Sequence, residues 1–199
     1  MRSYGAAAND VAQRELKERG LRQFIDSYLA GVAASPAAEG GARACLLLAR
    51  SPDSPVARVV AEYAACKRLQ LPVRAILTTL ETSAQVSGQH MALLPQFAVE
   101  IRLARDPRLL EAHEQLVLGV RASWTGDAMR RDPLKRDAYE AYSPDDRAKA
   151  LRAIASFERL WRVAAPPAGD AVGAGTGAPC AGSISEPHSG SPRPRASAR

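Results

Sequence analysis

His113 is the residue of this chain whose type and surroundings could support chemistry. It heads the short apolar run Leu116–Val117–Leu118, and a second short run then brings Gly126 beside polar residues. An imidazole can act as a general base or as a nucleophile that forms a covalent intermediate. We therefore take the segment 113–127 as the candidate site and His113 as its candidate catalytic residue.

This order of residues resembles the motif of the phospholipase D superfamily, in which His-x-Lys precedes an acid and a later Gly-Ser. His113 stands at the position of the nucleophilic histidine, and Gly126 follows at about the position of the glycine. The resemblance covers roughly residues 42–130, which corresponds to one motif-bearing half. It implies an α/β fold and phosphodiester cleavage through a phosphohistidine, at a site that two such halves share within one chain or in a homodimer.

The motif departs from the family pattern where the family carries charge. Gln115 stands at the lysine position, no acid stands near position 120, and Asp127 replaces the serine. Arg130 and Arg131 follow closely and could supply the missing charge, because guanidinium pairs well with phosphate oxygens. We therefore predict an anion-binding site that includes Gln115, Arg130 and Arg131.

A strand–helix–strand unit is predicted ahead of this segment, over roughly residues 42–78. The unalternating apolar run Cys45–Leu48 is typical of a strand buried on both faces, and 72–77 is the next strand. Ser54 and Pro55 form an N-cap and first-turn pair that opens the helix between them. The loops 50–54 and 78–83 follow the two strands, so they should lie at the ligand-binding edge of the sheet. Ser54, at a helix start, joins the candidate anion-binding residues.

Further elements follow from apolar spacing. We predict strands over 97–103, 115–118 and 122–125, a helix after Asp132–Pro133 that includes Ala141, and a last helix opened by Ser143–Pro144. An N-terminal helix is predicted from an apolar stripe at helical spacing, made up of Leu21, Phe24, Ile25, Tyr28, Leu29 and Val32. Residues 79–95 show no clear period.

The predicted fold class is α/β, with a central, mainly parallel sheet flanked by helices. The predicted organisation is an N-terminal helical segment (1–35), an α/β domain (42–164) and a disordered tail (165–199). The tail is rich in Pro, Gly, Ser and Ala, a composition that cannot offset the entropy of ordering.

A basic cluster lies between positions 121 and 136. Arg121, Lys135 and Arg136 could hold a nucleic-acid backbone while Trp124 stacks on a base. The alternative is a solvated helix start with local Arg–Asp pairs.

Composition limits the classes of protein that remain. The chain has 199 residues, a net charge of +6 and 46% apolar residues. Cys45 and Cys66 are predicted to be buried thiols, and no CxxC pair or Cys/His spacing predicts a metal site. No Gly-rich dinucleotide or phosphate-loop motif predicts a cofactor. No apolar run approaches the ~20 residues that cross a bilayer, and the cytoplasm is the expected location.

Three functions remain open. The leading hypothesis is a non-catalytic, phospholipase D-like module that binds a partner protein or an anionic ligand. The first alternative is a phosphodiesterase or phosphoryl-transfer enzyme that acts as a homodimer through His113. The second is a nucleic-acid-associated protein that uses the Arg121–Arg136 cluster.

Overall fold

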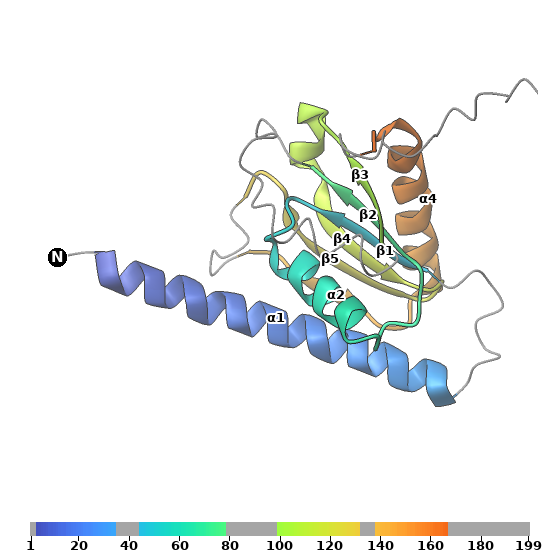
Figure 1. Cartoon of the computed structure of the whole chain (residues 1–199), viewed down its shortest axis with the longest axis horizontal. Coiled ribbons are helices and arrows are strands. Elements are labelled where there is room, and N and C mark those ends of the chain that lie inside the picture. Colours follow the sequence, from blue (N-terminus) through green and yellow to red (C-terminus); the bar gives the residue numbers. More distant parts are fainter. Residues whose placement is uncertain (1–2, 35–43, 79–98, 132–137, 167–199) are drawn as a thin grey trace, which may run out of the picture. The chain divides into compact units, whose positions relative to one another are not determined.

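A computed structural model describes residues 3–34, 44–78, 99–131 and 138–166 (Figure 1). The predictions for 79–95, for 132–137 and for the tail beyond 166 concern residues outside these ranges. The helices are α1 (Ser3–Ala34), α2 (Pro55–Ala65), the 3-10 helix η3 (Pro107–Glu111) and α4 (Arg147–Val163). The strands are β1 (Cys45–Ala49), β2 (Val73–Leu77), β3 (Val99–Leu103), β4 (His113–Leu118), β5 (Ala122–Ala128) and β6 (Ala141–Ser143).

The described strands form one mixed sheet in the order β3-β2-β1-β4-β5-β6. The predicted strand–helix–strand unit is present as β1-α2-β2, and β1, β2 and β3 are parallel. The expected parallel pairing holds only for these three strands, because β4, β5 and β6 each pair antiparallel to their neighbours. β4 and β5 are joined by the short connection 119–121, in which Gly119 has φ 59°, and so short a connection can only join antiparallel strands.

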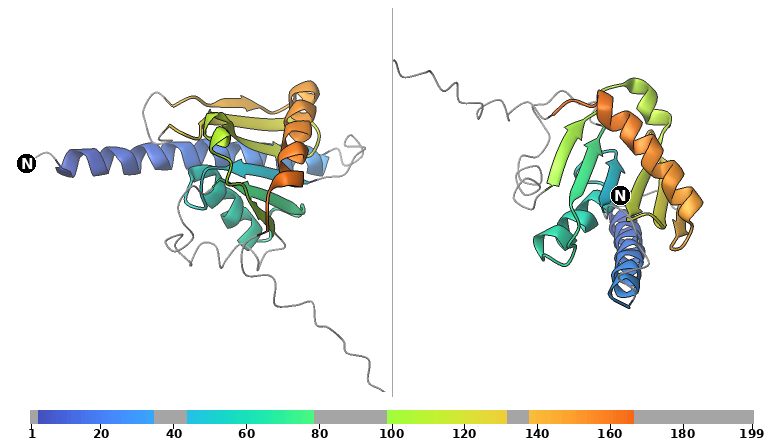
Figure 2. Two further views of the ribbon diagram at one scale, coloured as in Figure 1. Left: turned by 90° about the horizontal axis from the view of Figure 1, so that it is seen from above. Right: turned by 90° about the vertical axis from the view of Figure 1, so that its right-hand side faces the viewer.

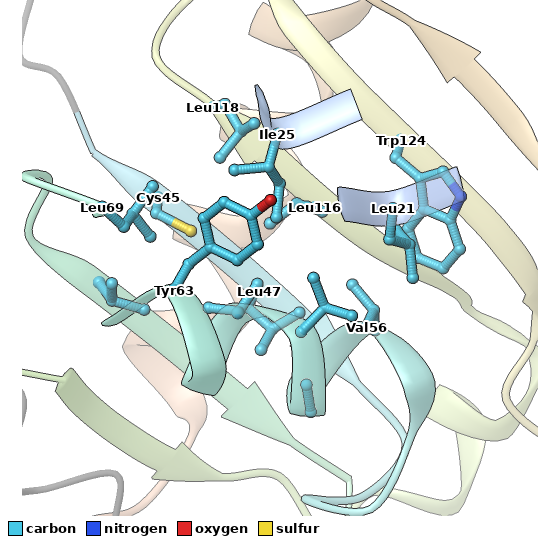
Figure 3. Close-up of a cluster of buried hydrophobic side chains, with 14 of the residues drawn as sticks. Leu21, Ile25, Cys45, Leu47, Val56, Tyr63, Leu69, Leu116, Leu118 and Trp124 are labelled. Atoms are coloured by element: carbon cyan, nitrogen blue, oxygen red, sulfur yellow. The ribbon is translucent and has the colours of Figure 1, made fainter. Parts of the chain in front are cut away.

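Helices cover both faces of the sheet (Figures 1 and 2). On one face, α1 and α2 pack over a core that includes Ile25, Leu47, Tyr63 and Trp124 (Figure 3). On the other face, α4 contributes Phe157 and Trp161 to a second, smaller core with strand residues such as Leu48. The predicted apolar stripe of α1 is confirmed, with Leu21, Phe24, Ile25 and Tyr28 all buried. None of the described helices is long and apolar enough to cross a membrane.

Two helix predictions are wrong: the helix after Asp132–Pro133 does not include Ala141, and the last helix does not begin at Ser143–Pro144. Ala141 and Ser143 lie in strand β6, which pairs with β5 through Trp124 and Tyr142, so backbone pairing overrides the helical spacing that the sequence showed. The last helix begins instead at Arg147, and its N-cap is Asp146, whose carboxylate accepts a hydrogen bond from Lys149 N at 2.9 Å.

The two cysteines in the described ranges have different surroundings. Cys45 is buried in β1, as predicted. Cys66 is exposed, because it is the C-cap of α2 and lies just past the last turn that packs on the sheet. The prediction that both thiols are buried is therefore wrong for Cys66.

Candidate functional site

The ends of three strands place the candidate residues at one edge of the sheet. β4 runs antiparallel to β1, so the start of β4 lies beside the end of β1. Leu48 pairs with Gln115 in this ladder. Arg50 follows Leu48 by two residues and His113 precedes Gln115 by two, so both lie near this end of the two strands. The end of β5 reaches the same edge, because Ala128 pairs with His113.

His113 is exposed, and its ring is held by the backbone. Its Nδ1 lies 2.8 Å from the carbonyl oxygen of Gly126. A carbonyl only accepts hydrogen bonds, so Nδ1 carries the hydrogen and the lone pair of the neutral ring lies on Nε2. The Tyr139 ring makes an edge contact with the imidazole, with centroids 6.0 Å apart. The histidine is therefore oriented with its accepting nitrogen available to a ligand.

Asp127 lies near this histidine, and neighbouring groups balance the negative charge of its carboxylate. Burial alone would raise the pKa of its carboxyl, but the hydrogen bonds outweigh burial and the pKa is lowered. The carboxylate accepts the N–H groups of Ala128 at 2.8 Å and Tyr139 at 3.2 Å. Arg131 adds an ion pair at 3.2 Å. The negative charge that the sequence placed here is thus matched within the protein.

Arg50 is held at this edge by hydrogen bonds from both its backbone and its side chain. Its N–H donates to Glu114 Oε1 at 3.0 Å, and one guanidinium nitrogen donates to the carbonyl oxygen of Arg131 at 3.1 Å. The residue is exposed. Arg50 therefore supplies a positive charge near the start of β4, where His113 lies.

Glu114 is a buried carboxyl directly beneath this edge. Only 5% of its surface is exposed, and burial raises its pKa, while hydrogen bonds from Arg50 and Ser54 act in the opposite direction. One pattern in the sequence marks this residue: an acid stands next to a histidine within an otherwise apolar strand. We conclude that Glu114 positions the Arg50 backbone rather than contacting a ligand.

The predicted anion-binding residues are only partly brought together. Gln115 lies half-buried two residues along β4, so it shares the face of the strand that carries His113. An ion pair with Asp127 holds Arg131 at this edge. Arg130, by contrast, is exposed and forms an ion pair with Glu111 at 3.0 Å. Ser54 is buried, and its side chain caps α2 by accepting from Ala57 N at 3.4 Å.

The predicted nucleic-acid cluster does not form one surface in the described residues. Trp124 is only 3% exposed and packs in the core between β5 and α1, so it cannot stack on a base as predicted (Figure 3). Arg121 pairs with Asp145 at 2.6 Å at the turn between β4 and β5, the end of these strands opposite His113. Lys135 and Arg136 lie outside the described residues.

A pocket of about 240 Å³ lies elsewhere, between α1 and β6. Its lining includes Phe24, Tyr142 and Pro144 and contains no charged side chain. It therefore offers nothing to an anion, and the candidate site remains the His113 edge.

Comparison with known proteins gives structural matches alone. No family model and no curated protein matches the chain. NucT from Helicobacter pylori is 13% identical, with a TM-score of 0.47 over 73% of this chain and 92% of NucT. Nuc from Salmonella typhimurium, a phospholipase D family member, is 11% identical, with a TM-score of 0.47 over 66% of this chain and 86% of Nuc.

Both matches are weak likenesses of fold, with TM-scores below 0.5. A third match, TrmBL2, is an archaeal chromatin protein whose structure is described as showing a novel mode of DNA binding. It is 14% identical, with a TM-score of 0.43 over 64% of this chain and 47% of TrmBL2. Fold does not carry function by itself, so the function is argued below from the residues of this chain.

Proposed function

We propose that this chain binds a phosphate-bearing ligand at the edge formed by His113 and Arg50, and that it does not turn the ligand over. The observation that carries the proposal is an oriented, exposed imidazole beside the strand end where the exposed Arg50 is held by Glu114 and Arg131. Arg50 can donate two parallel hydrogen bonds to phosphate oxygens, and the imidazolium form of His113 adds a further donor. Because Asp127 is already paired with Arg131, it does not oppose an anion at this edge.

The absence of turnover follows from the groups that surround the histidine. Gln115 at the lysine position carries no charge to stabilise a developing phosphorane. The partner of His113 Nδ1 is a carbonyl oxygen, which orients the ring but does not stabilise the cation as a hydrogen-bonded carboxylate would. These two features favour the binding module over the enzyme.

The rival function is a phosphodiesterase with His113 as nucleophile, acting as a homodimer. One observation favours it, namely the accessible Nε2 that the Nδ1 contact leaves for attack on phosphorus. Both functions are compatible with the cytoplasmic location expected from the sequence.

One set of measurements separates the two. Binding of inorganic phosphate and of bis(p-nitrophenyl) phosphate is measured by calorimetry, and release of p-nitrophenolate is followed by absorbance. We expect both probes to bind, with Arg50→Ala and His113→Ala each weakening binding about tenfold or more, the worth of a charge-assisted hydrogen bond.

The matched control is Arg130→Ala, which removes the same charge near the site but from an arginine already paired with Glu111. Its dissociation constants should stay within about twofold of the parent. Turnover that is lost in His113→Ala would establish the rival. Binding that Arg50→Ala leaves unchanged would contradict the proposed site.

A further inference from the structure

The outer face of α4 carries arginines without acids. Its exposed residues are Arg147, Ala148, Leu151, Arg152, Ala155, Arg159, Arg162 and Val163. The one acid of this helix, Glu158, is turned to the flank, where it pairs with Arg74. The outward face therefore presents four guanidinium groups and no carboxylate of its own.

Arginines on the opposite face of the molecule are arranged differently. Around α1 and α2, Arg22 and Arg58 contact Glu18, and Arg68 contacts Asp26 at 2.8 Å. Within the ranges that the structure describes, no carboxylate is found in ion-pair contact with Arg152 or Arg159. The positive charge of α4 is thus not balanced locally as it is around α1 and α2.

Stabilisation of the helix does not account for the two central arginines. Cations stabilise the last turn of a helix through its dipole, and Arg162 lies in that turn, where Arg102 also donates to the carbonyl oxygen of Trp161 at 2.6 Å. Arg152 and Arg159 lie in the middle of α4, away from both ends.

The spacing of the arginines suits a linear polyanion. Arg147 and Arg162 are separated by about 22 Å along the axis, at about 1.5 Å per residue. One strand of B-DNA presents a phosphate about every 3.4 Å, so about six phosphates span this distance. Long arginine side chains can reach phosphates on such a strand without a change in the helix.

A membrane surface fits this face less well. Helices that lie in a membrane interface bury Trp, Phe or Leu side chains in the lipid. In α4, Phe157 and Trp161 point to the sheet and are buried. The exposed apolar residues of the face are Leu151 and Val163, which lie about 18 Å apart along the helix.

We infer that the outer face of α4 binds the phosphate backbone of a nucleic acid without reading its sequence. Arg152 and Arg159 are the central contacts, and Arg147 and Arg162 are the flanking ones. This surface uses different residues from the phosphate site proposed at His113, so either can fail without the other.

The test uses the full chain and a fluorescent 20-base-pair duplex of arbitrary sequence. Binding is followed by anisotropy between 50 and 200 mM salt. Four phosphate contacts predict a slope of log K against log salt of about −3.6, and Arg152→Ala/Arg159→Ala should reduce it to about −1.8. The variant should remain folded, because alanine is the strongest helix former.

Two controls keep the test specific. Arg19→Ala/Lys67→Ala removes the same charge from exposed residues near the opposite face and should leave the slope unchanged. Arg152→Lys/Arg159→Lys keeps the charge and should bind within a few-fold of the parent. Absent or salt-independent binding, equal loss in the control variant, or preferential binding to vesicles containing phosphatidylserine would each overturn the inference.

Discussion

Gly126 lies beneath the indole of Trp124, and replacing it with alanine tests how tightly the candidate site is packed. A Cβ atom at this position would lie 2.5 Å from Cη2 and 2.9 Å from Cζ2 of Trp124. Trp124 is 3% exposed and packs in the core, so the ring cannot move aside without disturbing its neighbours. The carbonyl oxygen of Gly126 also holds the His113 ring, so the same substitution perturbs the site.

The expected cost can be estimated from two opposing effects. Overpacking of a filled core costs about 1–3 kcal/mol, while alanine in place of glycine within a strand gains about 0.5–1 kcal/mol. The free energy of unfolding of Gly126→Ala should therefore fall by about 1–2 kcal/mol. Urea denaturation followed by circular dichroism measures this loss as a lower midpoint with an unchanged slope.

A double-mutant cycle with Trp124→Phe isolates the clash. The phenylalanine ring lacks the outer indole atoms that the new Cβ would meet, so alanine at 126 should cost little in that background. Gly31→Ala is the control, because nothing lies within 4 Å of its added Cβ, and it should stabilise α1 by about 0.5–1 kcal/mol. Equal costs of Gly126→Ala in both backgrounds would refute the packing argument.

Two further predictions concern buried ionisable groups. Burial raises the pKa of Glu114, so its neutral form is favoured in the folded state, and the stability it contributes at low pH is lost as pH rises through the folded pKa. The glutamine of Glu114→Gln stays neutral at every pH. The free energy of unfolding of this variant should therefore rise relative to the parent between pH 4 and pH 8, as measured by denaturation curves. A difference in stability that does not vary with pH would contradict the prediction. Burial raises the pKa of the Cys45 thiol to about 12, so at pH 8 a disulfide reagent should modify the exposed Cys66 and reach Cys45 only in denaturant. Peptide mass spectrometry measures both sites, and native labelling of Cys45 at the rate of Cys66 would rule out the buried thiol.

Local patterns were sufficient for the elements that carry the fold. The apolar run at Cys45–Leu48 and the Ser54–Pro55 pair predicted β1 and the start of α2, and the structure confirms both. The stripe from Leu21 to Tyr28 predicted the buried face of α1. These predictions succeed because burial of a strand or a helix face and capping depend on residues close in sequence.

Pairing between strands distant in sequence decided the elements that local patterns did not predict. Ala141 has helical spacing with its neighbours, yet the hydrogen bonds of β5 are satisfied by taking 141–143 as a strand. The antiparallel pairing of β4 with β1 likewise cannot be predicted from the residues of either strand alone. Sheet pairing is non-local, so neither hydrophobic period nor capping residues can reveal it.

The amino-acid sequence by itself determined where His113 stands, ahead of an apolar strand and two residues before Gln115. Only the tertiary structure decided which groups surround it, because the direction of β4 brings the end of β1 and the following Arg50 to the start of β4, where Glu114 is buried. The same is true of Trp124 and Ser54, which look available to a ligand in the sequence. Trp124 lies on the buried face of β5, and Ser54 lies at the buried N-cap of α2. Tertiary packing decides which face of a strand or end of a helix is buried.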